Sequence, residues 1–147
     1  MKIKAWGFVL TIALAIGFFA VAGIYAGTTM PTETKLYAPY DHDKDVIAFT
    51  HAKHVNEHKI ACGECHHDDK GNPRTDLKEG DEVKRCFDCH NKPGEIKGKK
   101  AKGLSKEELL AYHANAVHEN CVGCHKDYNR KNKTKAAPYK CTDCHPK

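Results

Sequence analysis

The chain has 147 residues and a formal net charge of +5, and residues 27–147 contain only 15 Leu, Ile, Val and Phe residues. This is about 12% of the segment, below the roughly 20% at which a chain usually builds a core of its own. The composition excludes a multidomain protein. It predicts one domain at most, whose core is completed by something other than polypeptide.

The amino terminus has the pattern of an export signal. Lys2 and Lys4 precede residues 5–27, which carry no charge. A basic start followed by an apolar run is typical of a secretory signal, and Ala26 ends a suitable cleavage sequence. More than 20 apolar residues also suffice to span a bilayer. Residues 1–26 are therefore predicted to be a signal peptide or an uncleaved signal anchor, and both place the rest of the chain outside the cytoplasm, in the periplasm.

The elements that follow are predicted to be short. Residues 27–45 are polar and indicate an extended arm, and residues 46–147 are expected to form the functional domain, beginning with a short strand at residues 45–49. The strongest helix signal is the capping box Ser105-Lys106-Glu107-Glu108, after which apolar residues continue at helical spacing to Val117. Polar loops are predicted at residues 67–73, 91–103 and 126–135. We expect a mostly irregular fold with a few short α-helices and little β-structure.

All eight cysteines belong to copies of one pattern, Cys-x-x-Cys-His, which is the attachment motif of c-type haem. The two thiols bind the porphyrin, and the next imidazole is the proximal ligand of the iron. Zinc knuckles and a disulfide framework are the alternatives, and neither requires a histidine after every cysteine pair. We therefore predict four covalently bound haem c groups that form the core. The four haem sites, numbered in chain order, are Cys62/Cys65/His66, Cys86/Cys89/His90, Cys121/Cys124/His125 and Cys141/Cys144/His145.

Histidine is also the expected distal ligand. Met1 and Met30 are the only methionines, and both lie far from the motifs. Two histidines per iron give closed, low-spin centres of low potential, because the methionine that raises potentials is missing. Such centres favour electron transfer over catalysis. The histidines outside the motifs are His42, His51, His54, His58, His67, His113 and His118.

Two elements of the sequence resemble the class III c-type cytochromes, the small tetrahaem electron carriers of anaerobic bacteria. They are residues 49–54, Phe-Thr-His-Ala-Lys-His, and residues 62–67, which end in a double histidine. The resemblance covers roughly residues 46–147. It implies that His51 is the distal ligand of the first site, His67 that of the second and His54 that of the third. All four motifs here are short, whereas many members of the family have a longer spacing at the second and fourth sites.

The distal ligand of the fourth site departs from the family pattern. His113 lies in the middle of the predicted apolar helix face, and His118 lies to one side of it, three residues before Cys121. We predict His118, at a point where the helix is expected to fray, with His113 as the alternative. His42 is expected to be a solvated arm residue and His58 a surface histidine.

These features predict a periplasmic or membrane-tethered electron carrier of anaerobic respiration, and not an enzyme. The resemblance implies redox partners such as a hydrogenase, a dehydrogenase or a membrane redox complex. The alternatives are a small metal or oxyanion reductase and a subunit of a quinone-linked membrane complex. Residues 27–147 carry 22 basic and 19 acidic side chains, and four haems with ionised propionates would bring their net charge from +3 to about −1. Nucleic-acid binding is therefore not indicated.

Overall fold

A computed structural model of the chain describes residues 30–36, 38–42 and 44–145. The predicted signal or anchor lies outside these residues. Within the described ranges, no helix is long and apolar enough to cross a membrane.

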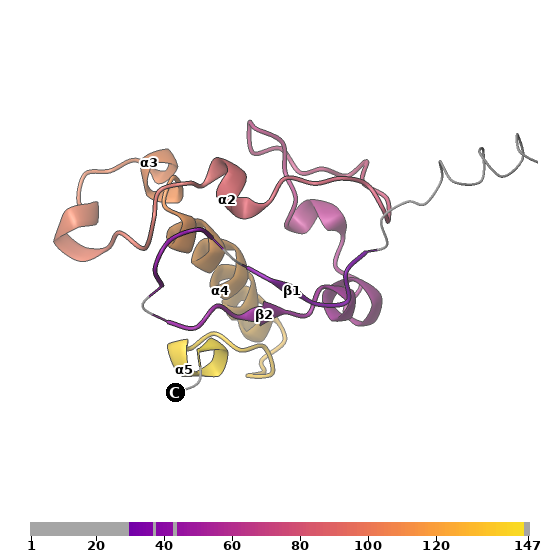
Figure 1. Cartoon of the computed structure of the whole chain (residues 1–147). Helices are drawn as coiled ribbons and strands as arrows, with labels where there is room; N and C mark the ends of the chain where they lie inside the picture. The colour runs from indigo at the N-terminus through magenta and orange to yellow at the C-terminus, as the bar shows by residue number, and fades with distance from the viewer. Residues whose placement is uncertain (1–29, 37, 43, 146–147) are drawn as a thin grey trace, which may run out of the picture. The chain divides into compact units, whose positions relative to one another are not determined.

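The described chain is mostly irregular, with short helices and a single two-stranded ribbon (Figure 1), which confirms the predicted fold class. The longest helix is α4, and it is contacted by α2 and α3. The elements are β1 (Thr34–Lys35), β2 (Ala48–Phe49), η2 (Lys53–Glu57), η3 (Cys62–Glu64), α2 (Cys86–Cys89), η4 (Gly98–Ala101), α3 (Lys106–Leu110), α4 (His113–Lys131) and α5 (Cys141–Cys144).

The ribbon ties the amino-terminal arm to the rest of the fold. β2 lies within the predicted strand, and it pairs antiparallel with β1 in the register Thr34 to Phe49. Beyond the ribbon, the N–H of Ala52 donates to the carbonyl of Thr32 at 3.1 Å. The arm is therefore paired along part of its length. The ribbon leads directly into His51 and the π-helix η2.

The predicted capping box at Ser105 is confirmed. Its hydroxyl accepts from the N–H of Glu108 at 3.2 Å, and the Glu108 carboxylate accepts from the N–H of Ser105 at 2.7 Å. The helix does not continue to Val117 as expected, because Tyr112 is extended (φ −82°, ψ 126°) and forms a parallel bridge with Lys92. A second helix, α4, begins immediately after this break.

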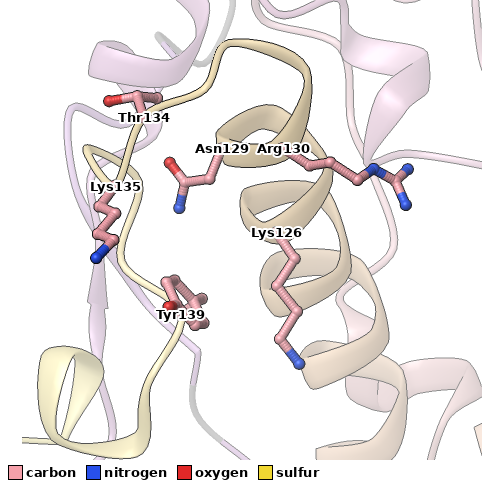
Figure 2. A pocket seen from close by; sticks show the side chains of 6 residues that line it. All are labelled: Lys126, Asn129, Arg130, Thr134, Lys135 and Tyr139. Atoms are coloured by element: carbon pink, nitrogen blue, oxygen red, sulfur yellow. The ribbon is translucent and has the colours of Figure 1, made fainter.

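α4 extends much further than the sequence predicted. It passes through His118, where fraying was expected, and it continues to Lys131, so the predicted loop at 126–135 is wrong over its first half. Asn129 explains how the chain turns back after the helix. Its side chain donates to the carbonyl of Ala137 at 2.8 Å and accepts from the N–H of the same residue at 3.1 Å. Figure 2 shows Asn129 directed from the helix towards the returning segment of the chain.

Few side chains are buried among polypeptide. Ala38, His113 and Asn129 are the only buried residues in the described part of the chain, and no large side chain there is fully buried. Burial of apolar surface is the dominant favourable contribution to folding. The polypeptide described here therefore lacks a conventional core, as its composition predicted.

Candidate haem-binding site

Each Cys-x-x-Cys pair lies within a helix, except that the second cysteine of the first pair directly follows its helix. Residues three apart share a face of a helix, so the two thiols of a motif emerge on the same side. The first site uses η3, the second α2 and the fourth α5, while the third lies inside α4. The carboxylates of Asp88 and Asp143 cap the amino termini of α2 and α5. They accept from the N–H groups of Arg85 at 2.8 Å and Lys140 at 3.1 Å.

The thiols of different motifs lie close enough to influence one another. The pKa of the Cys121 thiol is raised to about 11, mainly by desolvation and then by the nearby thiols of Cys65, Cys86 and Cys144. Desolvation is also the main cause of the raised pKa of each of these three neighbours. No disulfide bond joins the eight cysteines. At least one thiol of each motif therefore lies in the neighbourhood of Cys121.

The second cysteine of the third motif, Cys124, differs from the expectation in one respect. The helix was expected to fray near His118, before this motif, but the structure places Cys124 inside α4, three residues after Cys121. The side chain of Cys124 is exposed, as are those of four other motif cysteines, whereas that of Cys121 is half-buried.

Within the described residues, no atom of another segment lies within 4 Å of the position that a Cβ would take at Gly123, the residue before Cys124. The Cys124 thiol nevertheless helps to raise the pKa of Cys65, after the larger effect of desolvation. It therefore lies near the thiols of the first motif, and its attachment to haem stays a prediction.

Each proximal histidine faces one other histidine across a gap of similar width. The partner in each case is the distal ligand predicted for that site, and for the fourth site it is His118. The ring centroids of the four pairs are 6.3 Å apart for His51 and His66, 5.8 Å for His67 and His90, 6.1 Å for His54 and His125, and 6.4 Å for His118 and His145.

These separations fit an iron between the two rings. A metal–imidazole bond is about 2 Å long and the ring centre lies roughly 1 Å beyond the nitrogen, so two opposed ligands have centroids roughly 6 Å apart. The pairs are too far apart for direct hydrogen bonds between most ring atoms. Among the described residues, no group of three or more His, Cys, Asp or Glu side chains has the arrangement of a metal site.

Hydrogen bonds at Nδ1 orient most of the paired rings. A carbonyl oxygen only accepts, so a neutral ring that bonds to it through Nδ1 has its free lone pair on Nε2. This is the tautomer that binds metal, and metal-bound histidines normally donate their other N–H in this way. The carbonyl partners of Nδ1 belong to Thr50 for His54 (2.9 Å), Asp68 for His67 (2.7 Å), Leu110 for His90 (2.6 Å), Pro138 for His125, and Asp45 for His145 (2.9 Å).

Phe49 sets the position of two distal histidines at once. Its ring centroid is 5.7 Å from that of His51 and 4.6 Å from that of His54. The Nδ1 atom of His51 is buried, and no partner for it is found among the described residues. The Phe-x-His-x-x-His element therefore presents its two imidazoles from one aromatic support.

His113, the alternative ligand of the fourth site, has a different environment. It is 5% exposed, its Nδ1 lies 3.1 Å from the hydroxyl of Tyr40, and its ring meets Phe87 edge-on at 5.5 Å. His42, expected to be solvated, is exposed but lies against the Tyr40 ring at 4.4 Å and bonds to the carbonyl of Ala38 through Nε2. The structure gathers these side chains in an aromatic cluster beside the second motif.

The last histidine outside the motifs and outside the four pairs is His58. It is exposed, as expected, and its ring lies 6.0 Å from that of His54.

Sequence analysis missed Glu95. Its carboxylate lies 3.5 Å from Nδ1 of His118, and it also pairs with Lys97 at 2.6 Å. One glutamate in a loop rich in lysine and glycine carries no signal that would single it out. The contact depends on how that loop folds against α4.

A pocket follows the third site along α4 (Figure 2). Its lining includes the cationic side chains of Lys126, Arg130 and Lys135 together with Tyr139. Arg130 is paired with Asp127 at 2.9 Å.

Comparison with known proteins agrees with this geometry. Residues 26–145 match the class III cytochrome C family, so the match includes the whole amino-terminal arm. The chain is 30% identical over 104 residues to a protein named cytochrome c3 from Desulfovibrio desulfuricans, which covers 71% of this chain and 81% of that protein. No solved structure matches the chain significantly.

Proposed function

Because the chain belongs to the class III cytochrome c family, whose members are electron-transfer proteins with covalently bound haem c, we propose that it is a tetrahaem carrier with two histidine ligands at every iron. The observation that carries this proposal is the set of four opposed histidine pairs, each joining one attachment motif to one histidine outside the motifs. The ligand pairs proposed are those four.

The protein's own residues would close each centre. Haem iron supplies one-electron chemistry when it is bound. The two cysteine thiols of each motif would hold the haem covalently, and the two paired imidazoles would bind its iron, which would leave no place for a substrate. Without a methionine ligand, the centres are proposed to have low potentials.

The short spacing between motifs supports rapid transfer among the sites. Thiols of all four motifs lie within electrostatic reach of Cys121, so haems attached to them would be neighbours. The residues that hold them are fixed to helices and to backbone carbonyls, and electron transfer would therefore require no rearrangement of the chain.

The proposed setting is outside the cytoplasm, where the amino-terminal signal would deliver the chain. Hydrogenases, dehydrogenases and membrane redox complexes are the proposed partner classes. Anchoring through residues 5–27 is tested by the mass of the mature protein, because a cleaved chain lacks those residues.

A ligand substitution tests the four closed centres. In the purified holoprotein, the mass should correspond to four haems and all irons should be low-spin. His67→Ala should convert one centre in four to a high-spin iron that binds carbon monoxide after reduction. His58→Ala is the matched control, because His58 is exposed, and it should leave all four centres low-spin. A wild-type protein that binds carbon monoxide rapidly would contradict the proposal and favour a reductase.

A further inference from the structure

The fourth site differs from the others in what its distal histidine meets. Five of the eight proposed ligands bond to backbone carbonyls through Nδ1. Nδ1 of His118 instead lies 3.5 Å from a carboxylate oxygen of Glu95. Among the described residues, no other proposed ligand forms an ion pair with a carboxylate, although the charge of His67 acts on the neighbouring Asp68 carboxylate. An ionised acceptor interacts with an N–H donor about twice as strongly as a neutral one.

Backbone contacts fix the loop that carries Glu95 to the start of α4. The N–H of His113 donates to the carbonyl of Lys92 at 2.9 Å, and the N–H of Ala114 donates to that of Gly94 at 3.1 Å. Gly94 has a φ of +73°, a conformation that glycine adopts without strain. These two hydrogen bonds hold residues 92 and 94, which precede Glu95, against the start of α4.

Asn115 completes this attachment. Its amide accepts from the N–H of Ile96 at 2.8 Å and donates to the carbonyl of Ile96 at 3.0 Å. Asn115 and His118 are three residues apart on α4, so they lie on the same face of the helix. The residue clamped by Asn115 follows Glu95 directly, and this places the glutamate next to the ring of His118.

Lys97 forms an ion pair with Glu95 on the side away from His118. One carboxylate oxygen of Glu95 lies 2.6 Å from Nζ of Lys97, while the other faces His118. The side chain of Glu95 is one-third exposed, so solvent screens part of its field.

We propose that Glu95 is a positioning residue that orients His118 and lowers the reduction potential of the fourth site. A carboxylate beside Nδ1 makes the imidazole a more basic ligand, which stabilises the more positive ferric state over the ferrous state. Reduction adds one electron to one iron, and Glu95 remains a carboxylate throughout. The inference rests on the proposed function, since it requires that His118 ligates the fourth iron.

Redox titration of the holoprotein at an electrode tests the proposal, with each centre followed by its low-spin EPR signal. Glu95→Gln keeps an oxygen acceptor and removes the charge. It should raise the equilibrium constant for reduction of one centre about tenfold, which is a shift of about 59 mV for a one-electron couple. Glu119→Gln is the matched control. It removes the same charge one residue from His118, where Glu119 pairs with Lys106 at 3.3 Å, and it should shift every potential by less than half as much.

A third variant separates the inference from the proposed function. His118→Ala should remove one low-spin signal, and this signal should be the one whose potential moves in Glu95→Gln. If His118→Ala removes a signal but Glu95→Gln moves none, the role of Glu95 is wrong and the ligation stands. If His118→Ala leaves four low-spin centres, the ligation of the fourth site is wrong, and the role of Glu95 is refuted with it.

Discussion

Residues 30–90 and residues 91–145 position their histidines by different means. The first region is acidic, and its described residues form no helix longer than the five residues of η2. The second is basic, and α4 alone carries His118 and the third attachment motif over 19 residues. In the second region, the spacing along one helix therefore sets the geometry of the ligands. In the first region, loops and side-chain contacts set it.

Several contacts join the two regions, and three of them link distant parts of the chain. The rings of His54 and His125 lie 6.1 Å apart, Nδ1 of His145 lies 2.9 Å from the carbonyl of Asp45, and the hydroxyl of Tyr40 lies 3.1 Å from Nδ1 of His113. Two of these contacts involve proposed haem ligands. The association of the two regions is therefore expected to depend strongly on the cofactor.

Removal of the haems should have the largest effect on the association of the two regions. A chain with all eight cysteines replaced by alanine cannot attach haem covalently, and we expect it to be unfolded because no large side chain of the described residues is fully buried. Residual helix should be confined to α4, since an isolated helix of this length is only marginally stable in water. Circular dichroism measures the residual helix, and amide NMR shows whether the chain is unfolded. A cooperative melt of the haem-free chain would refute this prediction.

Loss of His113 should have an intermediate effect. His113→Ala empties a buried site and leaves the hydroxyl of Tyr40 without this partner, which should lower the free energy of unfolding of the holoprotein by about 2–3 kcal/mol. Tyr40→Phe removes only the hydroxyl and should cost less, about 1–2 kcal/mol. Denaturant unfolding measures the change, and the exposed His58→Ala is the control.

The same variant decides between the two candidate ligands of the fourth site. His113→Ala should retain four low-spin centres, because His118 and not His113 faces His145. A new high-spin centre in His113→Ala would assign the ligand to His113 instead.

The sequence was informative wherever a short local pattern dictates structure. The capping box at Ser105 required only residues three apart, and the strand at 48–49 followed from its own composition. The pairing of His118 with His145 stays a prediction, although the structure brings their rings to 6.4 Å. It was proposed from spacing to Cys121 alone.

Features that depend on distant segments were not predictable in this way. The break at Tyr112 requires Lys92, which lies 20 residues earlier and forms the bridge that extends the backbone. The length of α4, which includes Cys124, was missed because the side of the helix that carries the motif consists of histidine, cysteine and asparagine rather than an apolar stripe. Periodicity of apolar residues detects helices that pack on hydrophobic neighbours. It does not detect a helix whose inner face would contact haem.

The smallest expected effect is the pH dependence of the unfolding free energy that arises from His113. This residue of the second region contacts Tyr40 of the first. Burial is the main cause of its lowered pKa, and the charges of His42 and His90 lower it further. The unfolded chain has the ordinary histidine pKa of about 6.5, so below that pH it binds a proton more readily than the folded protein. The stability linked to His113 is therefore complete above about pH 6.5 and is lost as the pH falls through the folded pKa. Unfolding free energies measured between pH 7.5 and 5.5 should fall more steeply for the wild type than for His113→Asn, which has no titrating ring. His58→Asn should retain the wild-type slope, and equal slopes in all three proteins would show that His113 is not the group responsible.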